Sequence, residues 1–215
     1  MGVGLINGLI FTKLKVPSFL ATLGISIVID GIALYMSKGF LLMMENDTFR
    51  SLSVTFIAGL PSIFYWAVGI VIVCTLISVI TPFGRRIYAI GANASASAHS
   101  GINVGRTRIY VFMLSSLLAG MAGVLYMAQM GGGSVAIGAD MLIPLFASVV
   151  AGGTTLSGGV GGPHRTLLGV IIITWMQTGM LMLGIGKDIQ VVVFGIIAIL
   201  MSVVTTDRKK LKIVK

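Results

Sequence analysis

Long apolar runs are the feature that most constrains the fold of this chain. Five runs, at residues 18–36, 54–80, 109–130, 166–183 and 189–205, are long enough as helices to cross a hydrocarbon core of about 30 Å. The chain is 56% hydrophobic and only 10% charged, which is more apolar surface than a soluble domain can bury. Because the runs are continuous rather than alternating, they favour transmembrane helices over the strands of a β-barrel.

Two further apolar segments are too short to cross the membrane as straight helices. Residues 1–11 and 141–151 would each extend about 16 Å. The first lacks the basic start and cleavage site of a signal peptide and is typical of the end of a helix whose beginning is missing. The second carries Pro144 near its start and predicts a short broken helix. We therefore expect an all-α, polytopic transmembrane helix bundle that forms a single, N-terminally incomplete domain over residues 1–215.

The basic residues are distributed unevenly between the ends of these segments. The chain carries 15 Lys and Arg against 6 Asp and Glu, a net charge of +9. If each span crosses once and residues 141–151 count as a crossing, all basic residues lie on one side except Lys38, Arg50 and Lys187. Cytoplasmic loops are enriched in basic residues, so this side is predicted to be the cytoplasm and the chain to begin outside. Orientation in the membrane then explains the charge, and no nucleic-acid partner is expected.

The longest polar interval runs from Pro82 to Arg108 and has no acidic residue. It contains four arginines, Arg85, Arg86, Arg106 and Arg108. Asn93 is a good helix N-cap, residues 94–99 contain neither Gly nor Pro, and Gly101 can adopt the left-handed conformation that ends a helix. The interval therefore predicts a capped helix of about two turns on the cytoplasmic side. The alternative is a flexible Ala/Ser connector between two spans, because so short a helix is marginal in isolation.

A glycine-rich stretch at residues 152–159 allows two interpretations. It could be a phosphate-binding loop, but it lacks the Gly-Lys-Ser/Thr ending of such loops. A tight turn between two spans is the better interpretation. The turn would give structural roles to Gly152, Gly153, Gly158 and Gly159.

Residues that could carry out chemistry are sparse. His99 and His164 have no Cys, Asp or Glu at ligand spacing, so no metal site is predicted. The sequence shows neither a nucleophile motif nor paired carboxylates for acid–base work. We therefore expect no catalytic residue and no cofactor, and the chain is not predicted to be an enzyme.

Two further features lie within the spans, one acidic residue and one set of small residues. Asp30 is an intramembrane acid. It either faces a hydrated pathway in the bundle, extends to the interface, or pairs with a basic group on the N-terminal part that is expected to be missing. Small residues at four-residue spacing, Ser115, Ala119 and Gly123 with Ser116 and Gly120, line a helix face and predict close helix–helix approach.

The polar interval resembles the cytoplasmic loop of ABC importer permeases of the ribose/monosaccharide type. The resemblance rests on Gly84-Arg85-Arg86-Ile87-Tyr88-Ala89-Ile90-Gly91, on Asn93 and on Ser100-Gly101-Ile102-Asn103-Val104. It extends through Asn7-Gly8-Leu9, residues 16–23, Gly59-Leu60-Pro61, Gly152-Gly153-Thr154, Gly158-Gly159 and the last two spans. Family permeases have additional N-terminal spans, which agrees with the incomplete helix expected at the start of this chain.

The resemblance implies that residues 81–108 are a coupling loop that docks on separate ATPase subunits. The residues implied in coupling are Arg85, Arg86, Gly91, Asn93, Ser97, Ser100 and Gly101. Other implied partners are a second permease copy, identical or different, an extracytoplasmic sugar-binding protein, and membrane lipid.

The function implied is that of a multi-pass permease subunit in the cell inner membrane, importing a monosaccharide such as ribose. One alternative is an ABC permease for another polar solute, such as a nucleoside or autoinducer sugar. The other is a secondary transporter or channel, for which Asp30 is the candidate ion-coupling group.

Overall fold

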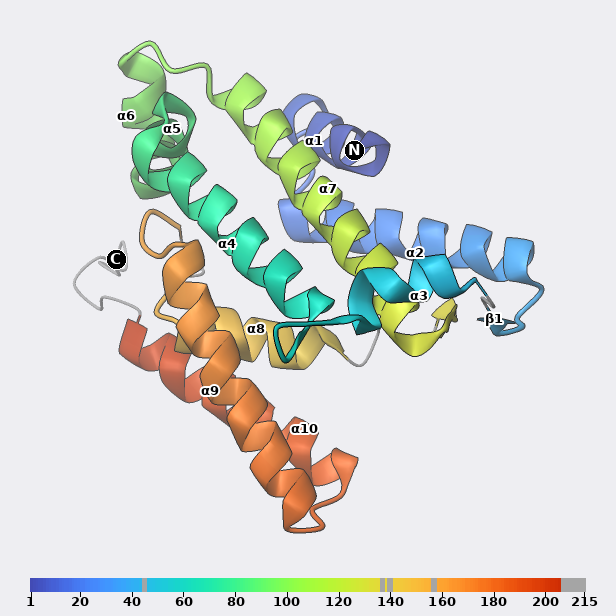
Figure 1. Cartoon of the computed structure of the whole chain (residues 1–215). Helices are drawn as coiled ribbons and strands as arrows, with labels where there is room; N and C mark the ends of the chain where they lie inside the picture. The colour runs from blue at the N-terminus through green and yellow to red at the C-terminus, as the bar shows by residue number, and fades with distance from the viewer. Residues whose placement is uncertain (44–45, 136–137, 139–140, 156–157, 206–215) are drawn as a thin grey trace. The chain divides into compact units, whose positions relative to one another are not determined.

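The computed structural model describes residues 1–43, 46–135, 138, 141–155 and 158–205 (Figure 1). By their contacts, the described residues within 1–70 and 98–137 form one compact unit, and those within 71–97 and 138–215 form the other. In the described chain, four helices are long and apolar enough to cross a membrane: Ser18–Ser37, Ser62–Ile80, Val104–Met130 and Pro163–Met182. The predicted all-α, polytopic architecture is confirmed.

The first unit is built on α7, the longest helix. Its helices are α1 (Gly2–Lys13), α2 (Ser18–Ser37), α3 (Asp47–Val54), the first half of α4 (Ser62–Ile80) and α7 (Val104–Met130). Two minimal antiparallel pairs join β1 (Leu42–Met43) to β4 (Gly132–Gly133) and β2 (Phe56–Ile57) to β3 (Leu60–Pro61).

Helix α1 packs antiparallel against α7, and two glycines make this approach possible. A Cβ atom on Gly4 would overlap the carbonyl of Phe112, and one on Gly8 would lie 2.9 Å from the Cα of Ile109. Of the predicted small-residue face of α7, Ser116 lies in this contact, because a Cβ atom on Gly4 would also overlap its hydroxyl oxygen, whereas Gly120 and Gly123 have nothing within 4 Å of a built Cβ. The close approach therefore combines two glycines of α1 with Ser116 of α7 and does not use the glycines of α7.

The second predicted span begins later than its apolar run. The run was expected to be helical from residue 54, but α3 ends at Val54 and α4 starts at Ser62 after the β2–β3 hairpin. The hairpin turns at Ala58 and Gly59, both with positive φ, as its two-residue loop requires. The Ser62 hydroxyl donates to the Leu52 carbonyl over 2.8 Å. Apolarity alone did not reveal this break.

The second unit contains the second half of α4 and the helices α5 (Pro82–Ala92), α8 (Leu142–Ala151), α9 (Pro163–Met182) and α10 (Lys187–Thr205). The helix α6 (Ala94–His99) begins in this unit. The core of the second unit is the buried cluster of Ala147, Ile173 and Phe194 from α8, α9 and α10. Helices α8 and α9 approach closely at Gly169, where a Cβ atom would overlap the Ser148 carbonyl, so the absence of a side chain permits the contact. The short helix predicted at residues 141–151 is confirmed as α8.

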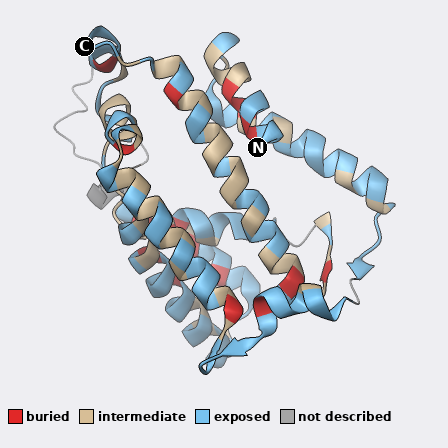
Figure 2. Ribbon diagram, turned by 45° about the horizontal axis from the view of Figure 1, so that its top comes forward, coloured by how far each residue is buried: buried red, intermediate tan, exposed pale blue. Residues whose placement is uncertain are grey.

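Most apolar side chains of the described spans are exposed, as Figure 2 shows in pale blue. Buried apolar residues among those described are few: Ala21, Ala128, Ala147, Val150, Ile173 and Phe194. In water such a surface would cause aggregation. Helices of a membrane protein keep such surfaces toward lipid or toward neighbouring helices, so the exposure agrees with an integral membrane protein.

Candidate functional site: the coupling loop and the glycine loop

The predicted coupling loop (residues 81–108, called the coupling loop below) begins with a sharp junction between α4 and α5. The Thr81 hydroxyl donates to the Ile77 carbonyl over 2.6 Å and accepts from the Gly84 amide over 3.2 Å. Pro82 occupies the first helical position, where its fixed φ and missing N–H are compatible with a helix start. Gly84 is buried. A Cβ atom at this position would overlap the Ser78 carbonyl, so the junction requires glycine here. The junction therefore depends on the Thr81 side chain, which caps α5, and on Gly84, which has no side chain.

Helix α5 was not expected from the sequence, which predicted a helix only after Asn93. The pair Thr81-Pro82 is the signal that could have revealed it, since an N-cap residue followed by proline is a common helix start. Arg85 and Arg86 lie on α5 and are exposed. Both guanidinium groups are therefore accessible to a partner protein at the surface.

Asn93 joins two helices. Its amide donates to the Ala89 carbonyl of α5 over 3.0 Å, while its side-chain oxygen accepts from the Ala96 amide and the Ser95 hydroxyl, each over 3.0 Å. The predicted N-cap is therefore confirmed. Ser97 is buried, and its hydroxyl donates to the Asn93 carbonyl over 2.8 Å.

The end of α6 is also as predicted. Gly101 has φ +81°, a left-handed conformation that costs other L-residues roughly 1–2 kcal/mol. Ser100 and Gly101 are exposed. Asn103 then caps α7 by accepting from the Arg106 amide over 3.0 Å, so α7 begins at Val104, five residues before the apolar run. The residues proposed for coupling from the sequence thus lie in or beside the two short helices α5 and α6, and Ser100 and Gly101 form an exposed turn after α6.

The glycine loop (residues 152–162) connects α8 to α9. Its described residues form a tight turn, as expected: the Thr155 amide donates to the Val160 carbonyl over 3.2 Å, and the Gly158 amide donates to the Thr155 carbonyl over 3.1 Å. Positive φ angles occur at Gly153, Gly158, Gly159 and Gly161. Gly152 has a different role, since a Cβ there would overlap the Arg165 carbonyl and separate α8 from α9.

Helix α5 rests directly on the glycine loop. The Tyr88 hydroxyl donates to the Gly161 carbonyl over 2.9 Å. A Cβ atom on Gly91 would lie 3.0 Å from the Cα of Gly159, and one on Gly159 would lie 2.9 Å from the Ala92 nitrogen. We call these two interactions the loop contact. Sequence reasoning gave Tyr88 no role, because a contact between residues 73 positions apart leaves no local signal.

Within the first unit, the basic residues at the ends of α1 and α7 lie together. The Arg108 guanidinium stacks over the Phe11 ring at 5.0 Å, and Phe11 contacts Phe112 edge to face. This places Lys13 at the same end of the antiparallel pair as Arg106. The arrangement agrees with the predicted positive end at the cytoplasm, while the basic residues after position 205 lie outside the described residues.

Asp30 lies on an exposed face of α2. Among the described residues no hydrogen bond or ion pair involves its carboxylate. In the part of the chain that the structure describes, no group of three or more His, Cys, Asp or Glu side chains is placed so that it could hold a metal ion. The role of Asp30 in a transport pathway stays a prediction.

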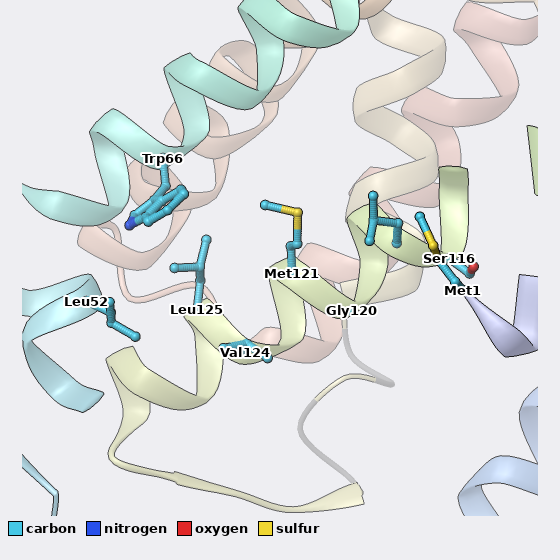
Figure 3. Close-up of a pocket in the computed structure, with 9 residues that line it drawn as sticks. Met1, Leu52, Trp66, Ser116, Gly120, Met121, Val124 and Leu125 are labelled. Carbon is cyan, nitrogen blue, oxygen red and sulfur yellow. The ribbon is translucent and has the colours of Figure 1, made fainter. Parts of the chain in front are cut away.

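A cavity of about 570 Å³ lies in the first unit beside α7. Figure 3 shows Trp66 of α4 and Met121 and Leu125 of α7 directed into the space between these helices. The lining is almost wholly apolar, with Ser116 as its one hydroxyl. Sugar sites need several polar groups that fix the hydroxyls, so this cavity does not have the character of a sugar site.

Comparison with known proteins gave consistent results. Residues 1–202 match the family described as branched-chain amino acid transport system / permease component. The chain is 39% identical to the probable ABC transporter permease protein YphD of Escherichia coli over 90% of this chain and 59% of that protein. No solved structure matches the chain.

Two further relatives are named for sugars. The chain is 35% identical to the ribose import permease protein RbsC of Bacillus subtilis, over 95% of this chain and 63% of that protein. It is 33% identical to the L-arabinose transport system permease protein AraH of Escherichia coli, over 96% of this chain and 62% of that protein. The chain therefore spans about three fifths of the length of these relatives, and it belongs to the family of membrane permease components of transport systems, not to a family of enzymes.

Proposed function

We propose that this chain is the membrane-spanning permease subunit of an ATP-driven sugar importer in the cytoplasmic membrane. The observation that carries the proposal is α6, an exposed helix capped at both ends within a basic loop. Membership of the permease family supports it, as do relatives named for ribose and L-arabinose import. A pentose or a similar monosaccharide is accordingly the proposed solute.

In this proposal the coupling loop binds a separate ATPase subunit. Arg85 and Arg86 provide positive charge at the surface of α5, which favours an acidic rim on the partner. Asn93, Ser97 and Gly101 hold α6 in shape through its caps. Gly91 lies in the last turn of α5, and Ser100 directly follows α6. Because α6 is too short to persist on helix propensity alone, its caps are needed to present one shape to the ATPase.

The transport cycle follows from the way α6 is connected. Closure of two ATPases on ATP would displace α6 in each of two permease copies, and the attached helices would move as rigid bodies. An extracytoplasmic binding protein would deliver the sugar, which agrees with the apolar lining of the cavity beside α7. Solute selection then lies largely outside this chain.

The proposal is tested by co-expressing the chain with an ABC ATPase subunit and a binding protein from the same cell. We expect the ATPase to co-purify with the chain in detergent, and membrane vesicles of the assembled complex to import labelled ribose or arabinose only with ATP. Import driven by an ion gradient without any bound ATPase would contradict the proposal and favour a secondary transporter. Import of a nucleoside in preference to both sugars would retain the ATP-driven mechanism and change the solute.

A further inference from the structure

The coupling helix has two covalent neighbours. On one side, Asn93 joins α6 directly to α5. On the other, residues 100–103 lead into α7, which Asn103 caps. If α6 had these two connections alone, its displacement would move α5, α4 and α7 directly. Helices α8, α9 and α10 would then receive no direct displacement from α6.

The loop contact adds a third connection, and it is not covalent. The Tyr88 hydroxyl is partly buried where it donates to the Gly161 carbonyl. On the next turn of α5, backbone meets backbone at Gly91 and Gly159, with no side chain between them. A contact between two backbones cannot yield by side-chain rotation, so it transmits displacement stiffly.

The far side of the glycine loop is equally stiff. Gly162 lies directly before Pro163, the first residue of α9. Helix α9 is held against α8 by the close approaches at Gly152 and Gly169, and both helices share a buried cluster with Phe194 of α10. Residues 71–97 accordingly fall in the same compact unit as α8, which precedes the glycine loop, and as α9 and α10, which follow it.

The geometry points to the loop contact as the path by which movement of α6 reaches α8, α9 and α10, with Tyr88 as its positioning residue. This inference rests on the proposed function. It assigns to Tyr88 and Gly159 a role in coupling ATP hydrolysis to solute movement that is separate from ATPase binding, because the Tyr88 hydroxyl is partly buried against Gly161 and Gly159 lies outside the coupling loop. Loss of the contact should uncouple the two processes without releasing the ATPase.

The test uses two variants and two matched controls in the assembled complex. Tyr88→Phe removes the hydroxyl and keeps the ring, and its control is Tyr110→Phe on the exposed face of α7. Gly159→Ala adds a methyl group against Ala92. Its control is Gly184→Ala, which has a similar φ of +72° but nothing within 4 Å of the built Cβ.

Two quantities are measured. Hydrogen exchange of the amides at residues 158–162 reports the contact itself, and the number of ATP molecules hydrolysed per solute imported reports coupling. One hydrogen bond corresponds to a change of about 2- to 10-fold. We expect Tyr88→Phe to raise both quantities by that factor and Gly159→Ala to raise them further. ATPase recovery and the half-saturating solute concentration should stay at parental values, and both controls should match the parent.

Two results would overturn the inference while leaving the proposed function intact. Unchanged exchange in Tyr88→Phe and Gly159→Ala would show that the contact does not restrain the loop. Raised exchange with an unchanged ATP-to-solute ratio would show that the contact supports the fold alone. Failure of the parent chain to hold an ATPase is a distinct result, which would contradict the proposed function and remove the path with it.

Discussion

Helices α4 and α5 are consecutive, yet they are stabilised in opposite ways. Helix α4, which the structure describes throughout, has 19 residues and buries only Ser62. Helix α5 has 11 residues, is capped by Thr81 and contacts the glycine loop through Tyr88 and Gly91. The first depends on an apolar environment that accepts many side chains. The second depends on a few hydrogen bonds and close backbone approaches that accept few changes, so the two should respond differently to substitution.

The largest effect is expected at the junction of the two helices. Gly84→Ala would place a methyl group on the Ser78 carbonyl, and overpacking against backbone costs about 2–3 kcal/mol. Its control is Gly69→Ala in α4, which has nothing within 4 Å of a built Cβ and should change stability by less than about 1 kcal/mol. Thermal unfolding of the detergent-solubilised variants measures both. Equal midpoints would remove the contrast between the helices.

The next effect concerns the end of α6. Gly101→Val should destabilise the helix by about 1–2 kcal/mol, because a β-branched residue is strained at φ +81°. Gly101→Asn should recover much of the loss, since Asn tolerates this conformation. Hydrogen exchange of the α6 amides measures both variants. Equal protection in the Val and Asn variants would show that the backbone at Gly101 does not need its left-handed conformation.

A somewhat smaller effect is expected at the start of α6. Asn93→Ala removes the acceptor for the Ala96 amide and should cost about 1 kcal/mol. Asn93→Asp keeps an acceptor at the same position and should exchange at nearly the parental rate. If the Ala and Asp variants exchange alike, the cap contributes nothing and α6 is held by other contacts.

The smallest effect is expected on an exposed helix face. Asp30 is exposed on α2, and removing an unpaired carboxylate from an apolar environment is neutral or mildly stabilising. Asp30→Leu should therefore keep membrane abundance and solute uptake within about twofold of the parent, the range of ordinary surface substitutions. Quantitative immunoblotting and vesicle uptake measure them. A clear loss of uptake at normal abundance would instead place Asp30 in a pathway.

The sequence predicted what depends on composition and on local chain geometry. Apolar runs located the spans, and residue preferences located the cap at Asn93 and the turn at Gly101, both of which the structure confirms. Local rules also existed for α5, in Thr81-Pro82, but the polar composition of the interval concealed them. The break before Ser62 was missed because its hairpin, residues 56–61, contains no charged or strongly polar side chain that would interrupt the apolar run.

Contacts between distant residues could not be predicted in the same way. The approach of α1 to α7 uses Gly4 and Gly8. The spacing pattern in α7 included Ser116, which lies against Gly4, but it did not indicate that α1 supplies the glycines. The hydrogen bond from Tyr88 to Gly161 joins two segments that the sequence treats separately. Such contacts depend on how helices pack, and a small residue permits a close approach without specifying its partner.

The central claim, that α6 is the ATPase-docking element, is tested most directly by ATPase recovery at equal membrane abundance. Asn93 and Gly101 lie outside the spans, so Asn93→Ala and Gly101→Val should insert as well as the parent. If only the formed helix binds, a destabilisation of about 1–2 kcal/mol lowers recovery of the co-purified ATPase about 5- to 30-fold. We predict that loss for Gly101→Val and a loss near 5-fold for Asn93→Ala. Parental ATPase recovery in both variants at normal abundance would contradict the claim and leave the loop as a connector.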